Sequence, residues 1–351
     1  MIKKDLMSLI RMFEQGNLNL DRLNYAMITL IPKEPDAKVL NKFRPISLIN
    51  CSFKIFLKHL NNRLIKVADR LVASNQMAFI KGRFILESVM AAHEIIHEVH
   101  KQKQEGVVLK LDYEKAYQWV SWAFLEEMLE TRGFGSKWRG WLQQVARGGS
   151  ICVRINDENS KFFKPGKGLS QGDPLSPLLF NLVADVFSRV LVKAAKQGLI
   201  IGLLPQVVEG GIISLQYADD TLLFLENNLG KASTLKWLLV YFEQMSGMKI
   251  NYDKSDLLTV GLDENQSNDF AILFCYKRCD FPIKYLGVPL HFDKLPRKDL
   301  QPVVDKIIKR FVGWRGRLLS YAGRLTLLKA CLASIPIYLL SITKFPKWVI
   351  I

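Results

Sequence analysis

Three aspartates at the ends of apolar segments constrain this fold more than any other feature of the sequence. Asp112 ends the segment VVLKLD, and Asp219 and Asp220 form the polar tip of IISLQYADDTLLFL, a pattern typical of two short strands. Asp tolerates turn geometry, so a structural turn is one interpretation, although Asn-Gly or Asp-Gly is the usual choice there. Adjacent carboxylates repel each other, and a cluster of three is reasonable only where divalent cations neutralise it.

Such a carboxylate cluster indicates a particular chemistry. Carboxylates supplied by strand ends are the ligands that a two-metal phosphoryl-transfer site requires, where one ion lowers the pKa of an attacking hydroxyl and the other stabilises a leaving pyrophosphate. Few, hard oxygen ligands favour Mg²⁺, with Mn²⁺ as an alternative. The sequence therefore predicts that Asp112, Asp219 and Asp220 are both the catalytic residues and the metal ligands.

The chain is also strongly basic. Its 351 residues include 49 Lys and Arg against 33 Asp and Glu, which gives a net charge of +16. A compact chain this basic repels itself unless a polyanion is near, so nucleic acid is the expected partner and a merely soluble basic surface is the alternative. Nine basic and two acidic residues lie between positions 297 and 329. This excess suits a phosphate backbone, although a solvated amphipathic face would show the same pattern.

Other features concern the environment of the chain. Apolar residues make up 49% of the sequence, which excludes a disordered protein. The sequence has no window of about 18 uncharged apolar residues, as a membrane span requires, and no signal peptide at its N-terminus. The five cysteines are scattered and odd in number, which favours free thiols in a reducing compartment. We therefore expect a folded, intracellular protein that does not bind membranes.

Hydrophobic periodicity predicts alternating helices and strands. Helices are expected over residues 52–71, 87–101, 121–133, 176–198 and 235–245. Strands are expected over residues 25–31, 107–112, 211–225 and 282–290, with a further hairpin over 151–163. Ser121 and Ser176 are the expected N-caps of their helices, and the proline after Ser176 suits the first helical position.

The sequence YADD at Tyr217–Asp220 resembles the catalytic signature of reverse transcriptases. More specifically, the chain is similar to the reverse transcriptase region of LINE-type, non-LTR retrotransposons of the kind found in plants. The similarity consists of eight blocks in the family's order: FRPISLIN, NQMAFIKGRFILESVM, LKLDYEKAY, GLSQGDPLSPLLFNL, QYADDTLLF, SGMKINYDKS, KYLGVPL and WRGRLLSYAGRLTLLKACLASIPIY. A single block is weak support, but eight in order make a chance match implausible.

The resemblance implies an α+β fold of the right-hand polymerase type, with a mixed palm sheet and a helical thumb. Residues 1–105 would form the fingers and the N-terminal part, residues 106–296 the palm with finger insertions, and residues 297–351 a basic, truncated thumb. The implied reaction is RNA-directed DNA synthesis, in which dNTPs are added to the 3′-hydroxyl of a DNA primer on an RNA template. The family's way of life implies a nuclear location, and nothing in the sequence points to a protein partner.

The resemblance also implies roles for single residues. Tyr117 would stack under the sugar of the incoming nucleotide and exclude a 2′-hydroxyl, while Gln171 and Gly172 would lie against that nucleotide. The cations expected at the triphosphate are Arg44, Arg83 and Lys254. The residues expected to bind template and primer are Arg310, Arg315, Arg317 and Arg324.

One position departs from the family's pattern. The chain has KAYQ, with Gln118, where the family usually has KAYD, and we expect that aspartate to cap the following helix rather than to bind metal. Loss of a cap costs about 0.5–2 kcal/mol of stability. The endonuclease, zinc-knuckle and RNase H regions of a full element are also absent from this chain. A catalytically inactive, nucleic-acid-binding remnant of the same element is therefore the alternative.

A third class of function depends on His93-Glu94-Ile95-Ile96-His97, which matches the H-E-x-x-H pattern of zinc peptidases. On a helix this spacing places His93 and His97 on one face, with Glu94 as the base. No third ligand follows at the metzincin spacing, so a zinc peptidase is a distant alternative.

Overall fold

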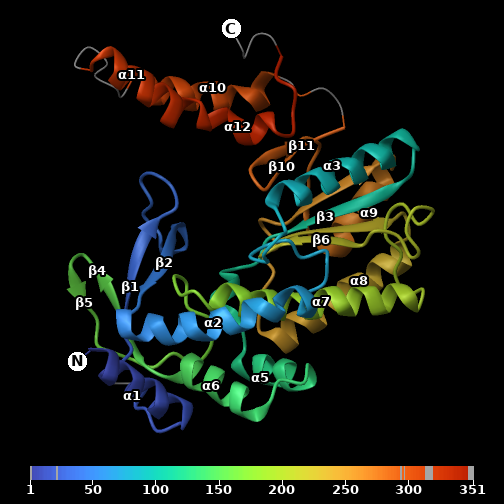
Figure 1. Ribbon diagram of the computed structural model, residues 1–351. Helices are drawn as coiled ribbons and strands as arrows, with labels where there is room; N and C mark the ends of the chain where they lie inside the picture. The colour runs from blue at the N-terminus through green and yellow to red at the C-terminus, as the bar shows by residue number, and fades with distance from the viewer. Residues whose placement is uncertain (1, 21–22, 293–294, 296, 313–318, 347–351) are drawn as a thin grey trace.

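The computed structural model, which describes residues 2–20, 23–292, 295, 297–312 and 319–346, combines β-sheets with helices on both sides (Figure 1). The strands are β1 (Tyr25–Pro32), β2 (Phe43–Leu48), β3 (Gly106–Leu111), β4 (Ser150–Ile155), β5 (Glu158–Asn159), β6 (Ser214–Tyr217), β7 (Asp220–Glu226), β8 (Asp256–Val260), β9 (Lys277–Arg278), β10 (Ile283–Tyr285) and β11 (Val288–Leu290). The helices are α1 (Ile2–Glu14), η2 (Leu40–Lys42), α2 (Cys51–Leu71), α3 (Ile85–Lys101), α4 (Ala116–Trp119), α5 (Trp122–Thr131), α6 (Ser136–Arg147), α7 (Ser176–Lys196), α8 (Leu229–Ser246), α9 (Glu264–Phe274), α10 (Arg297–Val312), α11 (Tyr321–Leu327), η4 (Leu328–Leu332) and α12 (Ser334–Leu340).

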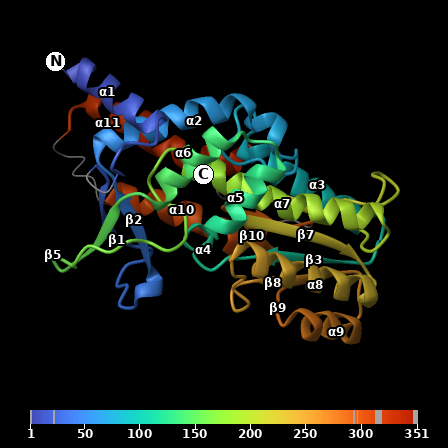
Figure 2. The same cartoon turned by 90° about the horizontal axis from the view of Figure 1, so that it is seen from below.

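A five-stranded sheet with the order β6-β7-β3-β8-β9 forms the centre of the molecule. The central strand β3 is antiparallel to both β7 and β8, whereas β8 and β9 are parallel, so the sheet is mixed. In Figure 1, α3 lies above this sheet, and α7 and α8 lie below it. From below, α9 lies beside β8 and β9 at one edge (Figure 2). The expected mixed sheet is therefore confirmed.

The apolar residues of β3 explain why both faces of this sheet are covered. Side chains alternate along a strand, so Val107 and Leu109 pack with the helices of one core, while Val108 packs with α3 in a second core. The hairpin of β10 and β11 also belongs to the second core. Burying a large apolar side chain contributes about 1.5–3 kcal/mol, so this double layer holds the ends of the central strands rigidly.

Helix starts depend on short polar side chains. Ser121 caps α5 as expected, because its hydroxyl accepts the N–H of Phe124 at 3.4 Å. The expected capping role of Ser176 is wrong, because Ser176 is already the first residue of α7. The buried Asp173 caps this helix instead: its Oδ1 accepts the N–H groups of Leu175 (2.7 Å) and Ser176 (2.8 Å). A carboxylate accepts two such donors more strongly than a hydroxyl does.

A second sheet, with the order β2-β1-β4-β5, lies to the side of the first (Figure 1). Here β1 is antiparallel to β2 and parallel to β4, so the chain returns from α6 to extend the N-terminal hairpin. Helix α3 packs against the central sheet although it belongs to the region expected to form the fingers. The division at residues 105 and 296 remains a prediction.

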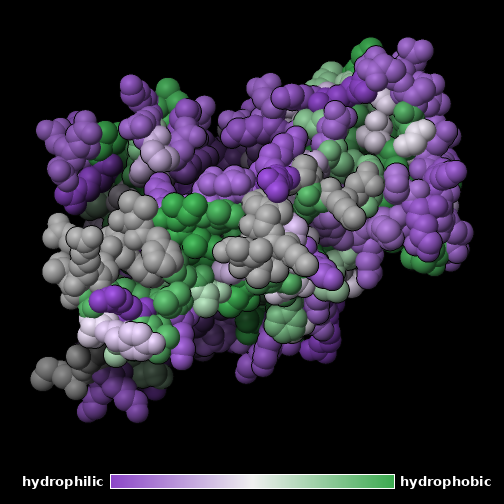
Figure 3. Space-filling model, turned by 90° about the horizontal axis from the view of Figure 1, so that it is seen from above, coloured by the Kyte–Doolittle hydropathy of each residue, from purple (hydrophilic) through white to green (hydrophobic). Residues whose placement is uncertain are grey.

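The C-terminal helices form a separate layer above the central sheet (Figure 1). Helices α11, η4 and α12 make one helical run over Tyr321–Leu340, and 6% of its apolar window is buried. Within the described part of the chain, it is the single helix long and apolar enough to cross a membrane by length and composition. Seen from above, hydrophobic residues gather in the middle of this face and hydrophilic residues along its margins (Figure 3).

Candidate active site

The strand register brings the three aspartates to the same end of the central sheet, where β3 ends and β7 begins; this end is called the acidic edge below. Leu111 of β3 pairs with Thr221 of β7. Asp112 follows Leu111 and Asp220 precedes Thr221, so the two aspartates continue neighbouring strands, which lie about 4.8 Å apart. Asp112 and Asp219 line the same cavity of about 690 Å³. Asp112 and Asp219, which are far apart in the sequence, therefore share one cavity, whereas Asp220 is not among the residues that line it.

Asp219 is presented by a very short turn. Tyr217 pairs with Asp220, which leaves only Ala218 and Asp219 between β6 and β7. Ala218 has a φ of +56°, a conformation that residues other than glycine adopt infrequently. A positive φ at the first loop residue suits a tight hairpin, whose twist must match that of the flanking strands. The turn places the Asp219 carboxylate beyond the strand ends, toward the cavity.

The acidic edge is electrostatically unfavourable without a cation. Loss of hydration on burial raises the pKa of all three aspartates. Repulsion from Asp219 adds to this effect at Asp220 and raises its pKa to about 6. At Asp112, the positive charge of Lys254 opposes the effect of burial, but burial is larger and the pKa stays above its ordinary value. The site therefore favours binding of positive charge, either as protons or as a metal ion.

The donor set at this edge fits a hard divalent cation. Carboxylate oxygens are the ligands that Mg²⁺ and Mn²⁺ take, and Mg²⁺ keeps several waters or substrate oxygens in its shell. Asp112 and Asp219 provide such oxygens from two strands, with Asp220 beside them. No group of three or more His, Cys, Asp or Glu side chains among the described residues is arranged to hold a metal by itself. Substrate oxygens would therefore have to complete the coordination.

Several of the expected nucleotide-binding residues line the same cavity as the aspartates, namely Arg44, Tyr117, Gln171 and Lys254. Tyr117 comes from α4, directly after the acidic strand end, and its ring stacks on Phe180 with 4.5 Å between ring centroids and an angle of 13°. Burial raises the pKa of Tyr117, so its phenol is neutral. The cavity thus combines acidic, basic and aromatic walls.

Two of the expected nucleotide-binding residues do not line this cavity. The guanidinium of Arg83 donates to the carbonyl oxygens of Ala73 (2.6 Å) and Gln76 (2.7 Å) and forms an ion pair with Asp69 at 2.8 Å. The structure thus assigns Arg83 a scaffold role in place of the triphosphate contact. Gly172 has a φ of +110°, and a Cβ there would lie 3.0 Å from the carbonyl oxygen of Ser47. Close approach to β2, rather than to a nucleotide, explains this glycine.

Sequence reasoning missed two polar residues of the cavity. Lys33 follows β1 and lies near Arg44, because its backbone N–H donates to the carbonyl of Lys42 at 2.9 Å. Burial and the positive charges of Lys254 and Arg44 lower the pKa of Lys33. Lys33 lies two residues beyond the strand expected over residues 25–31, and a cation at that strand end was the signal that could have revealed it. Gln118 also lines the cavity, and the helix that follows it, α5, is capped by Ser121.

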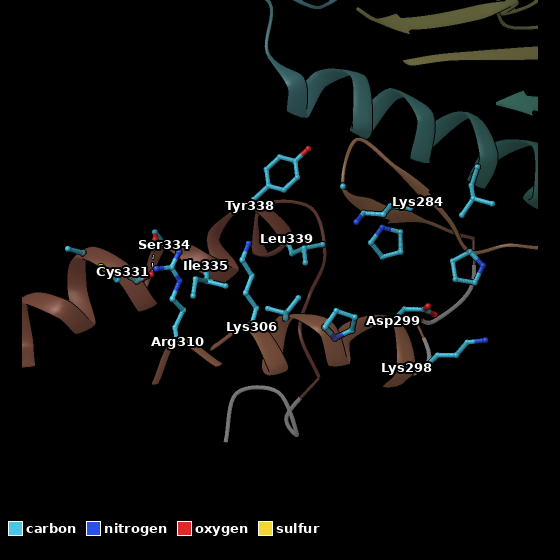
Figure 4. Close-up of a pocket in the computed structure, with 17 residues that line it drawn as sticks. Lys284, Lys298, Asp299, Lys306, Arg310, Cys331, Ser334, Ile335, Tyr338 and Leu339 are labelled. Carbon is cyan, nitrogen blue, oxygen red and sulfur yellow. Dashed lines mark hydrogen bonds between the residues drawn. The ribbon is translucent and has the colours of Figure 1, made fainter. Parts of the chain in front are cut away.

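The basic C-terminal region contributes to a second cavity of about 780 Å³, between the β10–β11 hairpin and the helices α10 and α12 (Figure 4). The basic residues that line it are Lys284, Lys298, Lys306 and Arg310. Of the residues expected to bind template and primer, Arg310 lies here, and Arg324 is exposed on α11. Arg315 and Arg317 lie outside the described residues.

The H-E-x-x-H pattern does not form a metal site in the described part of the chain. His93 packs edge-on against His291, with 5.1 Å between ring centroids, and burial lowers the pKa of His93. His97 lies one turn further along α3 and is exposed. Among the described residues, His93, His97 and His291 are therefore not arranged as the ligand set that a zinc peptidase requires.

Comparison with known proteins agrees with this geometry. A family model described as reverse transcriptase (RNA-dependent DNA polymerase) matches residues 31–290. The chain is 27% identical over 328 residues to the transposon TX1 uncharacterized 149 kDa protein of Xenopus laevis, covering 92% of this chain and 24% of that protein. It is 28% identical over 316 residues to the Pol polyprotein of the retrotransposable element R2DM of Drosophila melanogaster, covering 84% and 28%. The chain thus spans about a quarter of these two curated relatives.

A solved structure shares the fold. Telomerase from Candida tropicalis, in complex with a fragment of telomeric RNA, superposes with a TM-score of 0.51 at 12% identity, covering 83% of this chain and 49% of that chain. At this identity the likeness concerns the fold alone. The resemblance to non-LTR elements and the expected polymerase fold are both confirmed.

Proposed function

The chain belongs to the reverse transcriptase (RNA-dependent DNA polymerase) family, and we propose that it adds dNTPs to the 3′-hydroxyl of a DNA primer on an RNA template. One observation carries this proposal: Asp112, directly after β3, and Asp219, in the turn between β6 and β7, line a single cavity that Arg44, Lys254 and Tyr117 also line. Carboxylates opposite cations suit a substrate that carries phosphates and metal ions together. The residue ranges expected for fingers, palm and thumb belong to the same proposal.

Asp112 and Asp219, with Asp220 beside them, would hold the divalent cations, Mg²⁺ or alternatively Mn²⁺. Bound there, the ions would lower the pKa of the primer hydroxyl and stabilise the pyrophosphate. The protein's own part is to keep the carboxylates at the ends of rigid strands and ionised. Lys254 assists, because its positive charge opposes the rise that burial causes in the pKa of Asp112.

The basic residues of the cavity would hold the nucleotide. Arg44, Lys254 and Lys33 would bind its triphosphate, since each of these side chains lines the cavity. The ring of Tyr117 would lie under the sugar and leave no space for a 2′-hydroxyl. Its stacking on the fully buried Phe180 holds the ring in place.

Template and primer would lie along the basic C-terminal layer. Four basic side chains surround the second cavity, which borders the β10–β11 hairpin (Figure 4). Contacts to phosphates carry little sequence information, so this binding would be largely independent of sequence and would weaken steeply with salt.

Primer extension on an RNA template tests the proposal. With Mg²⁺ present, we expect the parent chain to extend the primer and Asp219→Ala to reduce extension by at least a thousandfold. Glu209→Ala, which removes an exposed carboxylate outside the cavity, is the matched control and should keep parental activity. If the parent extends no further than Asp219→Ala while both bind the RNA–DNA hybrid equally, this chain is an inactive nucleic-acid-binding remnant.

A further inference from the structure

The turn that carries Asp219 is held by a buried glutamine from a distant segment. Gln76 is 0% exposed. Its side-chain Oε1 accepts the backbone N–H of Ala218 at 2.9 Å, and its Nε2 donates to the carbonyl oxygen of Ala218 at 3.3 Å. One amide group thus binds both backbone groups of the residue that precedes Asp219.

This contact matters because Ala218 has an uncommon backbone conformation. A non-glycine residue at a φ of +56° is strained and persists only where its surroundings impose this conformation. The two-residue turn has no further residues with which to relax. The two hydrogen bonds from Gln76 are therefore well placed to hold the turn in this conformation and to fix the direction of the Asp219 side chain.

Gln76 is itself firmly placed. The segment around it runs parallel to β6 at the free edge of the sheet, where Met77 N–H donates to the Gln216 carbonyl at 3.0 Å and Gln216 N–H donates to the Asn75 carbonyl at 2.8 Å. Oε1 of Gln76 also accepts the N–H of Ala78 at 3.1 Å. Arg83 adds a bond from its guanidinium to the Gln76 carbonyl. The hydrogen bonds between Gln76 and Ala218, called the clamp below, therefore connect the turn that carries Asp219 to a firmly held segment.

We propose that Gln76 is a positioning residue, which orients the turn so that Asp219 and Asp112 can bind a divalent cation together. The inference rests on the proposed function of the same site. The position requires glutamine because it needs an acceptor and a donor on one side chain of this length. Methionine has nearly the same shape and offers neither strong group, whereas asparagine keeps both groups but withdraws them by one methylene.

Mn²⁺ binding to the full chain, measured by loss of the free-ion EPR signal, tests the inference without any need for catalysis. We expect Gln76→Met to weaken Mn²⁺ binding at least threefold, with Asp219→Ala as the reference for complete loss of the site. The matched control is Asn75→Ala. This substitution removes two side-chain hydrogen bonds of the same segment, to Ser188 and Ser214, and neither of them involves the turn. This control should bind Mn²⁺ within threefold of the parent. Gln76→Asn replaces Gln76→Met if the latter fails to fold.

Primer extension gives the second readout. Gln76→Met should reduce kcat at least tenfold and leave KM for dNTP within threefold, since Gln76 does not line the nucleotide cavity. If Gln76→Met binds Mn²⁺ within threefold of the parent, the inference is wrong, whatever the extension data. If Asn75→Ala weakens binding as much as Gln76→Met, a general loss of packing explains both, and the inference is again wrong. If Gln76→Met weakens Mn²⁺ binding as expected but the parent extends no primer, the proposed function alone is refuted.

Discussion

Replacing Asp220 by Asn should stabilise the protein, although it should impair catalysis. Asp220 is adjacent to Asp219 and close to Asp112, and burial together with repulsion from Asp219 raises its pKa from 3.8 to about 6. The folded state therefore binds a proton more tightly than the unfolded state does. Stability must then fall as the pH rises from about 4 to about 6, and the full penalty is present above pH 6.

The magnitude follows from this change in pKa. Each pKa unit corresponds to about 1.4 kcal/mol, so a rise of about two units corresponds to roughly 3 kcal/mol. Asp220 is exposed on one side, and solvent screening reduces this figure to about 1–1.5 kcal/mol. Asparagine has nearly the same shape and carries no charge. We therefore expect Asp220→Asn to raise the free energy of unfolding by about 1 kcal/mol at pH 7.5 and to leave it unchanged at pH 4.

Urea unfolding, followed by tryptophan fluorescence in the presence of EDTA, measures this effect at both pH values. Glu209→Gln is the control, because it removes an exposed carboxylate outside the cavity and should change stability by less than about 0.5 kcal/mol at either pH. Added Mg²⁺ should stabilise the parent more than Asp220→Asn and so reduce the difference. If Asp220→Asn raises the free energy of unfolding equally at pH 4, or does not raise it at pH 7.5, charge repulsion does not determine the stability of this edge.

Two further predictions concern the walls of the two cavities. Tyr117→Ala should raise incorporation of ribonucleotides relative to deoxynucleotides at least tenfold, measured by single-nucleotide extension; an unchanged ratio would show that the ring does not exclude the 2′-hydroxyl. Replacing both Lys306 and Arg310 by Gln should weaken binding of an RNA–DNA hybrid and reduce the slope of log affinity against log salt by about 1 to 2, measured by fluorescence anisotropy. An unchanged slope would place the nucleic acid elsewhere.

The sequence predicted those parts of the site that depend on local pattern. Asp112 ends an apolar strand and Asp219 sits in a two-residue tip, so alternation and turn chemistry were sufficient to place them at strand ends. Arg83 shows where such reasoning stops. Its charge and its place in a family block suggested a phosphate contact, but its partners are carbonyl oxygens up to 14 residues away in the chain. Which acceptors surround a cation is decided by tertiary packing.

Non-local contacts also explain the glycine and the helix cap. Gly172 is required because β2 passes 3.0 Å from where its Cβ would lie, and the sequence contains no sign of that neighbour. At α7, the Ser-Pro pair had the right composition for a helix start, but Asp173, three residues earlier than Ser176, provides stronger acceptors. At Gly172 the residue was correctly singled out for a different physical reason, whereas at α7 the cap was assigned to the wrong residue.

The cost of the acidic edge and the clamp on its turn have a common origin. Carboxylates that must bind a cation together repel one another when it is absent, so a flexible turn would relax by moving Asp219 away from Asp112. The molecule prevents this with a two-residue turn, a buried glutamine and a central strand packed on both faces. Because this edge is rigid, repulsion between its carboxylates lowers the stability of the folded protein until protons or metal ions bind there. On this reasoning, Asp220→Asn should stabilise the metal-free protein and weaken cation binding, whereas Gln76→Met should weaken cation binding and also lower stability, because it leaves buried backbone groups of Ala218 without partners.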